Sequence, residues 1–426
     1  MCPPDTTRSP VTRRALLGST VAVAAGLVGA SGTAAASQSP AATVVSQNAY
    51  LGFDVVKLLR AESLAEVRTI TGGFLEDIEP ELYAARADAI AESAATADAD
   101  VVALQEAVLL RRGQSGADGS ESGDVVVDLL DGIRTALAKR GLDYTVAAES
   151  VANDIELPAE TDDGPATLRI TDRDVVLVRS DLDTADPVAG TYDAALELPI
   201  PESDRTLPIT RGYSAVTVTV GGIDVGVVST HLESASPRYR HRQAGDLLDA
   251  LPETGPVVVC GDFNSAPGEA AYDRLTRSLT DPHAELRPDA TGATCCQAKD
   301  LQNDESLLDR RIDAMLYRGG VRPTAIRRVG HRPDDRISVE VNGETVRVWP
   351  SDHAGVVGSF ELSATASSTV TPSRAQSSPA TVSDSATTTL PPDSNATGAS
   401  GPGFGARSAL VGLGMGLGAW LRRRTR

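Results

Sequence analysis

Five short segments of the sequence place Asp, Glu, Asn or His at one end of an apolar run. They are LQE with Glu106, STHLE with His231, GDFNS with Asp262 and Asn264, RID with Asp313, and SDH with Asp352 and His353. Carboxylate and amide oxygens at a solvent-facing strand end suit a hard divalent cation, and an imidazole there can move a proton. One such residue alone is usually structural. Five together predict a shared polar site.

The GDFNS segment is the most specific of the five. Gly261 allows a tight exit from the apolar run of residues 257–259, and Asp262 and Asn264 are two residues apart. On an extended chain this spacing points both side chains to the same face. By contrast, a single histidine such as His231 at a strand end is more often structural. A single glutamate such as Glu106 is also weak evidence, because Glu is common at strand ends.

The elements that must position these residues alternate between strands and helices. Helical periodicity predicts helices over residues 82–97, 124–140 and 240–251, and an acidic insertion is expected at 154–164. Short β-branched runs predict strands buried on both faces. These runs cover residues 101–104, 174–178, 215–220, 225–229, 257–259 and 354–360.

The five segments, in this order, are similar to those of the endonuclease/exonuclease/phosphatase family. The resemblance covers about residues 46–362, nearly all of the sequence that is expected to fold. It implies an α+β fold, a four-layer α/β/β/α sandwich in which two mixed β-sheets lie face to face with helices outside. It also implies a hydrolase of phosphate esters, and a folded domain over residues 37–362.

The resemblance further implies a metal site. Glu106 would bind Mg²⁺ or Mn²⁺, assisted by Asn48 near the first strand and by Asp352. Oxygen ligands suit these ions better than zinc, which prefers His and Cys.

The same resemblance implies the catalytic roles. His353 would activate the attacking water, and Asp313 would accept the other ring proton of that imidazole. Asp262 would position the nucleophile, and Asn264 would donate to the phosphoryl oxygens. His231 would either protonate the leaving oxygen or donate to the phosphate.

Residues 173 and 174 depart from the family pattern, because many relatives carry Asn where this chain has Arg173-Asp174. No role follows for either residue from the sequence. Arg242, which opens the helix after the His231 strand, is a candidate substrate-binding residue, although solvation of an exposed side chain explains it equally well.

The substrate stays open among several classes. A nucleic acid or another phosphodiester is favoured, with a phospholipid head group or a phosphomonoester as alternatives, and a non-catalytic binding module of the same fold as the least favoured interpretation. Arg111-Arg112 and the RYRHR segment at 238–242 are candidates for contacts with a phosphate backbone. The chain is expected to act as a monomer.

The composition is strongly acidic, with 58 Asp and Glu against 39 Lys and Arg, a net charge of −19. This is typical either of an ordinary acidic protein or, as we favour, of one adapted to high salt. At molar salt the screening length falls to roughly 3 Å, so the charge excludes neither nucleic acid nor a membrane surface as a partner.

The cysteines define no complete disulfide framework. Cys2 lies in a segment expected to be removed, which leaves Cys260, Cys295 and Cys296. Either Cys260 pairs with one of the adjacent cysteines or all three are buried thiols. The adjacent pair has neither metal-site spacing nor a histidine close by in the sequence.

Both ends of the chain are expected to be targeting segments. Residues 1–36 contain Arg13-Arg14, a short apolar run and a small-residue exit, and they resemble a twin-arginine export signal. Residues 363–401 are a Ser/Thr/Pro-rich stalk. Residues 402–426 begin with Pro-Gly-Phe and resemble the PGF-type sorting signal of halophilic archaea. The expected location is the cell surface, after export and sorting machinery has processed the chain and a lipid anchors its C-terminus.

Overall fold

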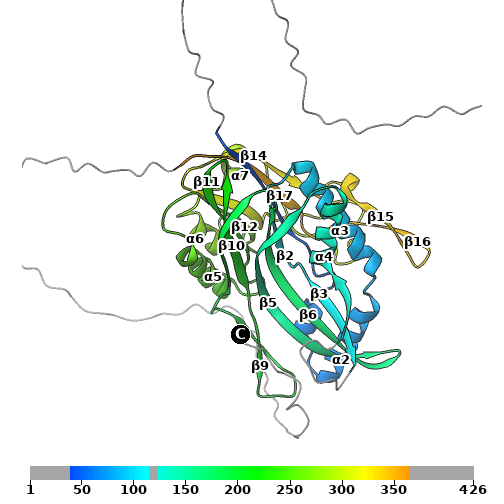
Figure 1. The fold of residues 1–426 in the computed structure, drawn as a ribbon. Coiled ribbons are helices and arrows are strands. Elements are labelled where there is room, and N and C mark those ends of the chain that lie inside the picture. The colour runs from blue at the N-terminus through cyan, green and yellow to red at the C-terminus, as the bar shows by residue number, and fades with distance from the viewer. Residues whose placement is uncertain (1–38, 115–122, 365–426) are drawn as a thin grey trace, which may run out of the picture. The chain divides into compact units, whose positions relative to one another are not determined.

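The computed structural model describes residues 39–114 and 123–364, and Figure 1 shows their fold. The expected signal (1–36), nearly all of the stalk and the sorting segment (402–426) lie outside these residues. Two main sheets are present. The eight-stranded sheet has the order β14 (Val321–Val329), β17 (Gly355–Leu362), β1 (Ala41–Asn48), β2 (Val101–Gln105), β6 (Gly164–Arg179), β3 (Leu109–Gln114) and β4 (Asp124–Asp128), and β5 (Tyr144–Thr161) also pairs with β6.

The five-stranded sheet has the order β13 (Asp313–Arg318), β12 (Val257–Asp262), β11 (Ile223–His231), β10 (Gly212–Val220) and β7 (Asp183–Thr191). Two small hairpins are separate, β8 (Leu196–Pro199) with β9 (Thr206–Ile209) and β15 (Ile337–Val341) with β16 (Glu344–Val348). Both large sheets are mixed, because β1–β2 and β11–β12 are parallel while β12–β13 and β1–β17 are antiparallel.

The helices cover the outer faces of the two sheets (Figure 1). The eight-stranded sheet packs against α2 (Leu64–Glu76), α3 (Pro80–Ala97) and α4 (Leu129–Lys139), and the five-stranded sheet packs against α5 (Pro237–Ala250) and α6 (Ala270–Leu275). Short helices α1 (Val56–Leu59) and α7 (Pro282–Leu286) and a 3₁₀ turn (Pro333–Asp335) complete the described elements. No helix among the described residues is long and apolar enough to cross a membrane.

Strand β2 shows why its sequence is apolar at every position. Val101 and Ala103 belong to the core between the two sheets, whereas Val102 and Leu104 belong to the core under the helices. Alternate side chains of a strand point to opposite faces, and here both faces are covered. The expected four-layer α/β/β/α sandwich is therefore confirmed.

One expectation about an individual element is wrong. Residues 124–140 are not one helix, because β4 occupies 124–128 and α4 begins only at Leu129. The segment expected as an acidic insertion, residues 154–164, forms the outer part of the long β5–β6 hairpin. Charged side chains at the edge of the hairpin replace the apolar–polar alternation that identifies an ordinary strand in a sequence. They also protect the exposed edge from pairing with a strand of another molecule. The expected helices at 82–97 and 240–251 correspond to α3 and α5.

Candidate active site

The pairing register of the second sheet brings three of the expected residues side by side. His231 is opposite Asp262, and Asp262 is opposite Asp313. Parallel β11 and β12 end together, and antiparallel β13 begins at that edge, so all three side chains meet at one end of the sheet. The expected convergence follows from strand direction. A change of register by one residue would turn these side chains to the other face.

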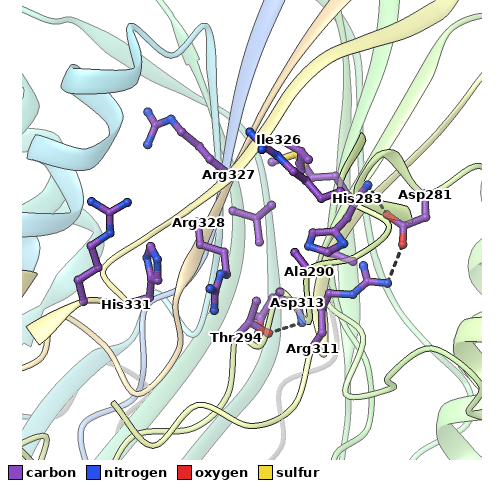
Figure 2. Close-up of a pocket in the computed structure, with 16 residues that line it drawn as sticks. Asp281, His283, Ala290, Thr294, Arg311, Asp313, Ile326, Arg327, Arg328 and His331 are labelled. Atoms are coloured by element: carbon purple, nitrogen blue, oxygen red, sulfur yellow. Dashed lines mark hydrogen bonds and ion pairs between the residues drawn. The ribbon is translucent and has the colours of Figure 1, made fainter. Parts of the chain in front are cut away.

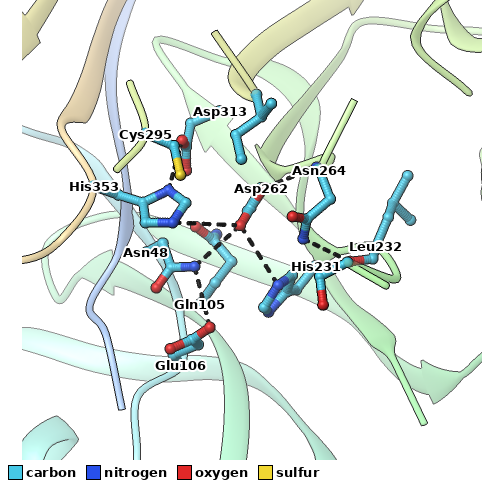
Figure 3. A network of polar contacts seen from close by, with 12 residues as sticks. Asn48, Gln105, Glu106, His231, Leu232, Asp262, Asn264, Cys295, Asp313 and His353 are labelled. Atoms are coloured by element: carbon cyan, nitrogen blue, oxygen red, sulfur yellow. Dashed lines mark hydrogen bonds and ion pairs between the residues drawn. The ribbon is translucent and has the colours of Figure 1, made fainter. Parts of the chain in front are cut away.

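The first sheet supplies the remaining side chains from its corresponding edge. Asn48 ends β1 opposite Gln105, the last residue of β2, and Glu106 follows immediately. Asp352 and His353 precede β17, which runs antiparallel to β1. The predicted residues of both sheets therefore lie in one cluster, shown in Figure 3 around Asp262.

Backbone conformation helps to aim two of these side chains. Glu106 and Asn264 adopt φ values of 54° and 48°, the left-handed region that non-glycine residues rarely enter. A Cβ at Gly261 would overlap the carbonyl oxygen of Thr230, so only glycine fits between β11 and β12. Such conformations persist where the surrounding structure holds them, and they occur often at functional sites.

Arg86 of α3 fixes the loops that carry the first-sheet residues. Its buried guanidinium donates to the carbonyl oxygens of Ala49, Tyr50 and Pro350. These carbonyls lie directly after β1 and before Asp352. A five-donor group can satisfy several buried carbonyls at once, which a lysine cannot do in the same planar geometry. Nothing in the sequence pattern around Arg86 indicates this role.

Asp262 is the centre of the polar network. Its Oδ2 lies 3.2 Å from Asn48 Nδ2, 3.5 Å from His231 Nε2 and 3.9 Å from His353 Nε2, and its Oδ1 accepts the backbone N–H of Asn264 at 2.8 Å. Asp262 is 2% exposed. Burial and the nearby Asp313 raise its pKa to about 7 against the opposing effect of His353.

His353 and Asp313 form a close, buried pair within the cluster. Nδ1 of His353 lies 2.8 Å from Asp313 Oδ2, and this leaves Nε2 facing Asp262. Burial alone would lower the pKa of His353, but Asp313, Asp352 and Asp262 outweigh it and raise that pKa well above its ordinary value. The backbone N–H of Asp313 is in turn 3.0 Å from the hydroxyl of Thr294.

His231 is in a different electrostatic environment. Its Nδ1 lies 3.1 Å from Nη1 of Arg211, a residue that the sequence analysis did not identify. Burial, Arg211 and His353 lower the pKa of His231 well below its ordinary value. The ring is therefore neutral at neutral pH, and only one of its two nitrogens carries a proton. The sequence does not show this charge state, because it depends on burial and on the contact with Arg211 that the fold creates.

The oxygen ligands proposed for a cation are present in the cluster. Asn48 donates to Glu106 Oε1 at 3.4 Å, and Oδ1 of Asp352 is buried without a hydrogen-bond partner among the described residues. Burial, then Asp172 and Asp352, raise the pKa of Glu106. Crowded carboxylates with a free oxygen fit a hard cation. Asp262, Asp313 and His353 also form a group whose ligand atoms lie within 4.8 Å of one another.

Lys299 pairs with this acidic group, and the sequence analysis did not identify it. Its Nζ lies 2.8 Å from Asp352 Oδ2 and 5.3 Å from the ring centroid of Tyr50. The lysine side chain is half exposed, at 51%, whereas that of Asp352 is buried. Lys299 therefore supplies a positive charge at the solvent side of the cluster.

The remaining candidates have different outcomes. Asn264 lies in the cluster, where its Nδ2 donates to the Leu232 carbonyl at 2.9 Å and one amide hydrogen is left. Arg242 is exposed on α5, and no described residue of the cluster contacts it. Its neighbour Gln243 is the residue that holds the loop, through Glu233 N–H at 2.7 Å and the Ala194 carbonyl at 2.6 Å.

Arg173 and Asp174, to which the sequence assigned no role, differ from each other in the structure. Arg173 is structural, since it donates to the carbonyl of Ala107 at 2.7 Å and pairs with Asp128 at 2.6 Å. Asp174 is fully buried, and neither carboxylate oxygen has a hydrogen-bond partner among the described residues. Burial and Asp172 raise its pKa well above the ordinary value.

The cysteines contradict the expected alternatives. Cys260 is a free, buried cysteine, and the disulfide joins the adjacent Cys295 and Cys296. A histidine is also close to this pair in space, because Cys296 Sγ lies 3.8 Å from His353 Nε2. The sequence could not indicate this proximity, since 57 residues separate Cys296 from His353.

The family model of the endonuclease/exonuclease/phosphatase family matches residues 72–353, more than half of the chain. The chain therefore belongs to this family, whose members hydrolyse phosphate esters. No curated protein is significantly similar to it in sequence.

Several solved structures are similar to this chain at low sequence identity. An endonuclease/exonuclease/phosphatase family protein from Bacteroides thetaiotaomicron is 16% identical, covers 76% of this chain and 99% of its own, and gives a TM-score of 0.49. A mannosyl-6-phosphatase of the same species is 15% identical, with coverages of 75% and 99% and a TM-score of 0.46. The human Nocturnin catalytic domain with bound sulfate is 17% identical, with coverages of 76% and 96% and a TM-score of 0.41. None of them identifies the ester that this chain hydrolyses.

Proposed function

We propose that this chain is an extracellular, Mg²⁺- or Mn²⁺-dependent phosphodiesterase that uses activated water, and that its substrate is a nucleic acid or a similar diester. The observation that carries the proposal is the buried Asp313–His353 pair at 2.8 Å, whose second ring nitrogen faces Asp262. An imidazole oriented by a carboxylate at one ring nitrogen, with the other nitrogen directed into a polar cluster, is the arrangement that general base catalysis uses once the ring is neutral.

The protein's own groups divide the reaction between them. Water attacks phosphorus while its proton passes to Nε2 of His353, and the bond from phosphorus to the leaving oxygen breaks. Asp313 keeps the Nδ1 proton of His353 in place. The Nε2–H of His231 donates to a phosphoryl oxygen, and Asn264 has one amide hydrogen for the same purpose. Donors fixed before the reaction stabilise the charge that develops in the transition state.

Asn48, Glu106 and Asp352 would hold the cation. When bound, it supplies positive charge that polarises a phosphoryl oxygen and lowers the pKa of neighbouring acids. His353 must release its proton before it can act as a base. Asp352 and Asp262 are among the carboxylates that raise the pKa of His353, so positive charge held beside them by a bound cation would lower that pKa and favour the release.

The test of this function is a substrate panel. Purified protein with Mg²⁺ or Mn²⁺ is assayed on DNA, RNA, bis-p-nitrophenyl phosphate, p-nitrophenyl phosphate and sphingomyelin. We expect turnover of the diesters, abolished by His353→Ala and by EDTA. Hydrolysis of p-nitrophenyl phosphate alone would make the protein a phosphomonoesterase. If no substrate of the panel is hydrolysed, the result would support a non-catalytic binding module.

Export and anchoring belong to the same proposal. The sequence patterns of residues 1–36 and 402–426 support secretion, a Ser/Thr/Pro-rich stalk and attachment at the cell surface through a processed, lipid-bearing C-terminus. Mass spectrometry of the mature protein should find Ser37 as the N-terminal residue and no peptide after the PGF segment. Replacing Arg13-Arg14 with Lys-Lys should keep the protein inside the cell.

A further inference from the structure

A cavity of about 250 Å³ lies beside the reaction centre, between α7 and strands β13 and β14. Its wall contains five arginines, which are Arg287, Arg311, Arg327, Arg328 and Arg332. Figure 2 shows Arg327, Arg328 and His331 on one side of the cavity and His283 and Arg311 on the other. Such a concentration of basic groups is unexpected in a chain with a net charge of −19.

The carboxylates of the wall do not neutralise these arginines. The two acids, Asp281 and Asp313, are already engaged, Asp281 with Arg311 at 2.7 Å and Asp313 with His353 at 2.8 Å. None of the other four arginines of the wall forms an ion pair with a carboxylate of the described residues. Arg328 uses one donor on the carbonyl of Ala293. The cavity therefore carries uncompensated positive charge.

Burial and the positive charge of the arginines lower the pKa of both histidines in the wall. Burial and then Arg311 lower the pKa of His283, and burial and then Arg328 lower that of His331. Both rings are accordingly neutral at neutral pH. Nδ1 of His331 is also a buried nitrogen without a hydrogen-bond partner among the described residues. In the cavity, each neutral imidazole can therefore offer one N–H hydrogen bond, and the positive charge comes from the arginines.

We propose that this cavity is an oxyanion site that binds a phosphate group, separate from the reaction centre. Planar guanidinium groups match the geometry of phosphate oxygens, and bonds between charged groups are the strong ones. Asp313 belongs to both places, because it lines the cavity and also holds His353. The phosphate is either free inorganic phosphate or a further phosphate group of an extended substrate.

The binding test uses the purified full chain, inorganic phosphate and isothermal titration in EDTA, so that it does not depend on hydrolysis. The cavity variant is Arg327→Ser with Arg332→Ser. The matched control is Arg68→Ser with Arg134→Ser, which removes two exposed arginines on α2 and α4. We expect saturable binding to the wild type and to the control, and at least about tenfold weaker binding to the cavity variant. Equal binding by both variants, or no saturable binding to the wild type, would overturn the proposal.

Kinetics distinguish the two sources of phosphate. For an extended substrate, the ratio of KM for an oligonucleotide to KM for bis-p-nitrophenyl phosphate should rise several-fold in the cavity variant and stay constant in the control. For free phosphate, added phosphate should change the rate on bis-p-nitrophenyl phosphate in the wild type more than in the cavity variant. Failure of the proposed hydrolase function would show as no turnover by the wild type, and the titration would still decide whether the cavity binds phosphate.

Discussion

The guanidinium of Arg211 and the imidazole of His231 are in direct contact, 3.1 Å apart at Nη1 and Nδ1. Arginine is only a donor, so Nδ1 of His231 must be the acceptor, and the ring proton must be on Nε2. That nitrogen points to Asp262 Oδ2 at 3.5 Å. The Nε2–H tautomer is the one that the proposed donation from His231 to the phosphate requires.

Replacing Arg211 tests this assignment. In Arg211→Met, the Nδ1–H tautomer becomes accessible and the pKa of His231 rises toward its ordinary value, because a neighbouring positive charge is lost. We expect a loss of roughly 10- to 100-fold in kcat, as for other partners that orient a catalytic group. Nitrogen chemical shifts of His231 should change with it. Arg134→Met, on the exposed surface of α4, is the control. An unaltered tautomer would show that the contact with Arg211 does not determine which nitrogen of His231 carries the proton.

The Asp313–His353 pair should behave as one unit. His353→Ala should reduce the diesterase rate by roughly 10²–10⁴ without a loss of cooperative melting. Asp313→Asn should reduce it through His353, because the amide cannot accept the Nδ1 proton in the same way. The double variant should then lose little more than His353→Ala alone. Fully additive losses would contradict a shared role.

Lys299 and the cation are expected to compete for Asp352. EDTA should abolish hydrolysis, and Glu106→Gln should raise the Mg²⁺ concentration needed for half-maximal activity. Lys299→Met removes the 2.8 Å ion pair with Asp352, so the cation no longer has to displace a positive charge in order to bind that carboxylate. The Mg²⁺ concentration needed for half-maximal activity should therefore fall several-fold. A titration of activity against Mg²⁺ measures all three. If Lys299→Met needs more Mg²⁺, the lysine acts on the substrate instead.

Asp174 should destabilise the fold at neutral pH. Burial raises its pKa in the folded state, so the folded protein binds the proton more tightly than the unfolded chain does. Stability from this group is therefore complete below the unfolded pKa and is lost as pH rises toward the folded pKa. Asp174→Asn should add about 1–3 kcal/mol at pH 8 and progressively less toward pH 4, measured by urea unfolding. A pH-independent difference would mean that the carboxylate is partnered.

The sequence by itself determined the strands that form the site and the residue types at their ends. Apolar runs end before Glu106 and Asp262, and another begins after Asp313, so polar residue types at strand ends were visible in the sequence although the structure buries Asp262 and Asp313. The five strand-end motifs together predicted the convergence, and the strand directions that produce it came from the structure. The prediction failed at β4, where the expected helix includes the short valine run at 125–127 although the helix begins only at Leu129.

Only the tertiary structure decided which polar groups surround that cluster. Arg211 sets the ring of His231, Lys299 pairs with Asp352, Cys296 lies beside His353, and Arg86 ties the supporting loops, all through contacts between segments distant in the chain. The charge state of each histidine depends on these neighbours and on burial, which are properties of three-dimensional position. Residue type and spacing identify a histidine at a strand end. Its proton is placed by the groups that packing brings within about 4 Å of the ring.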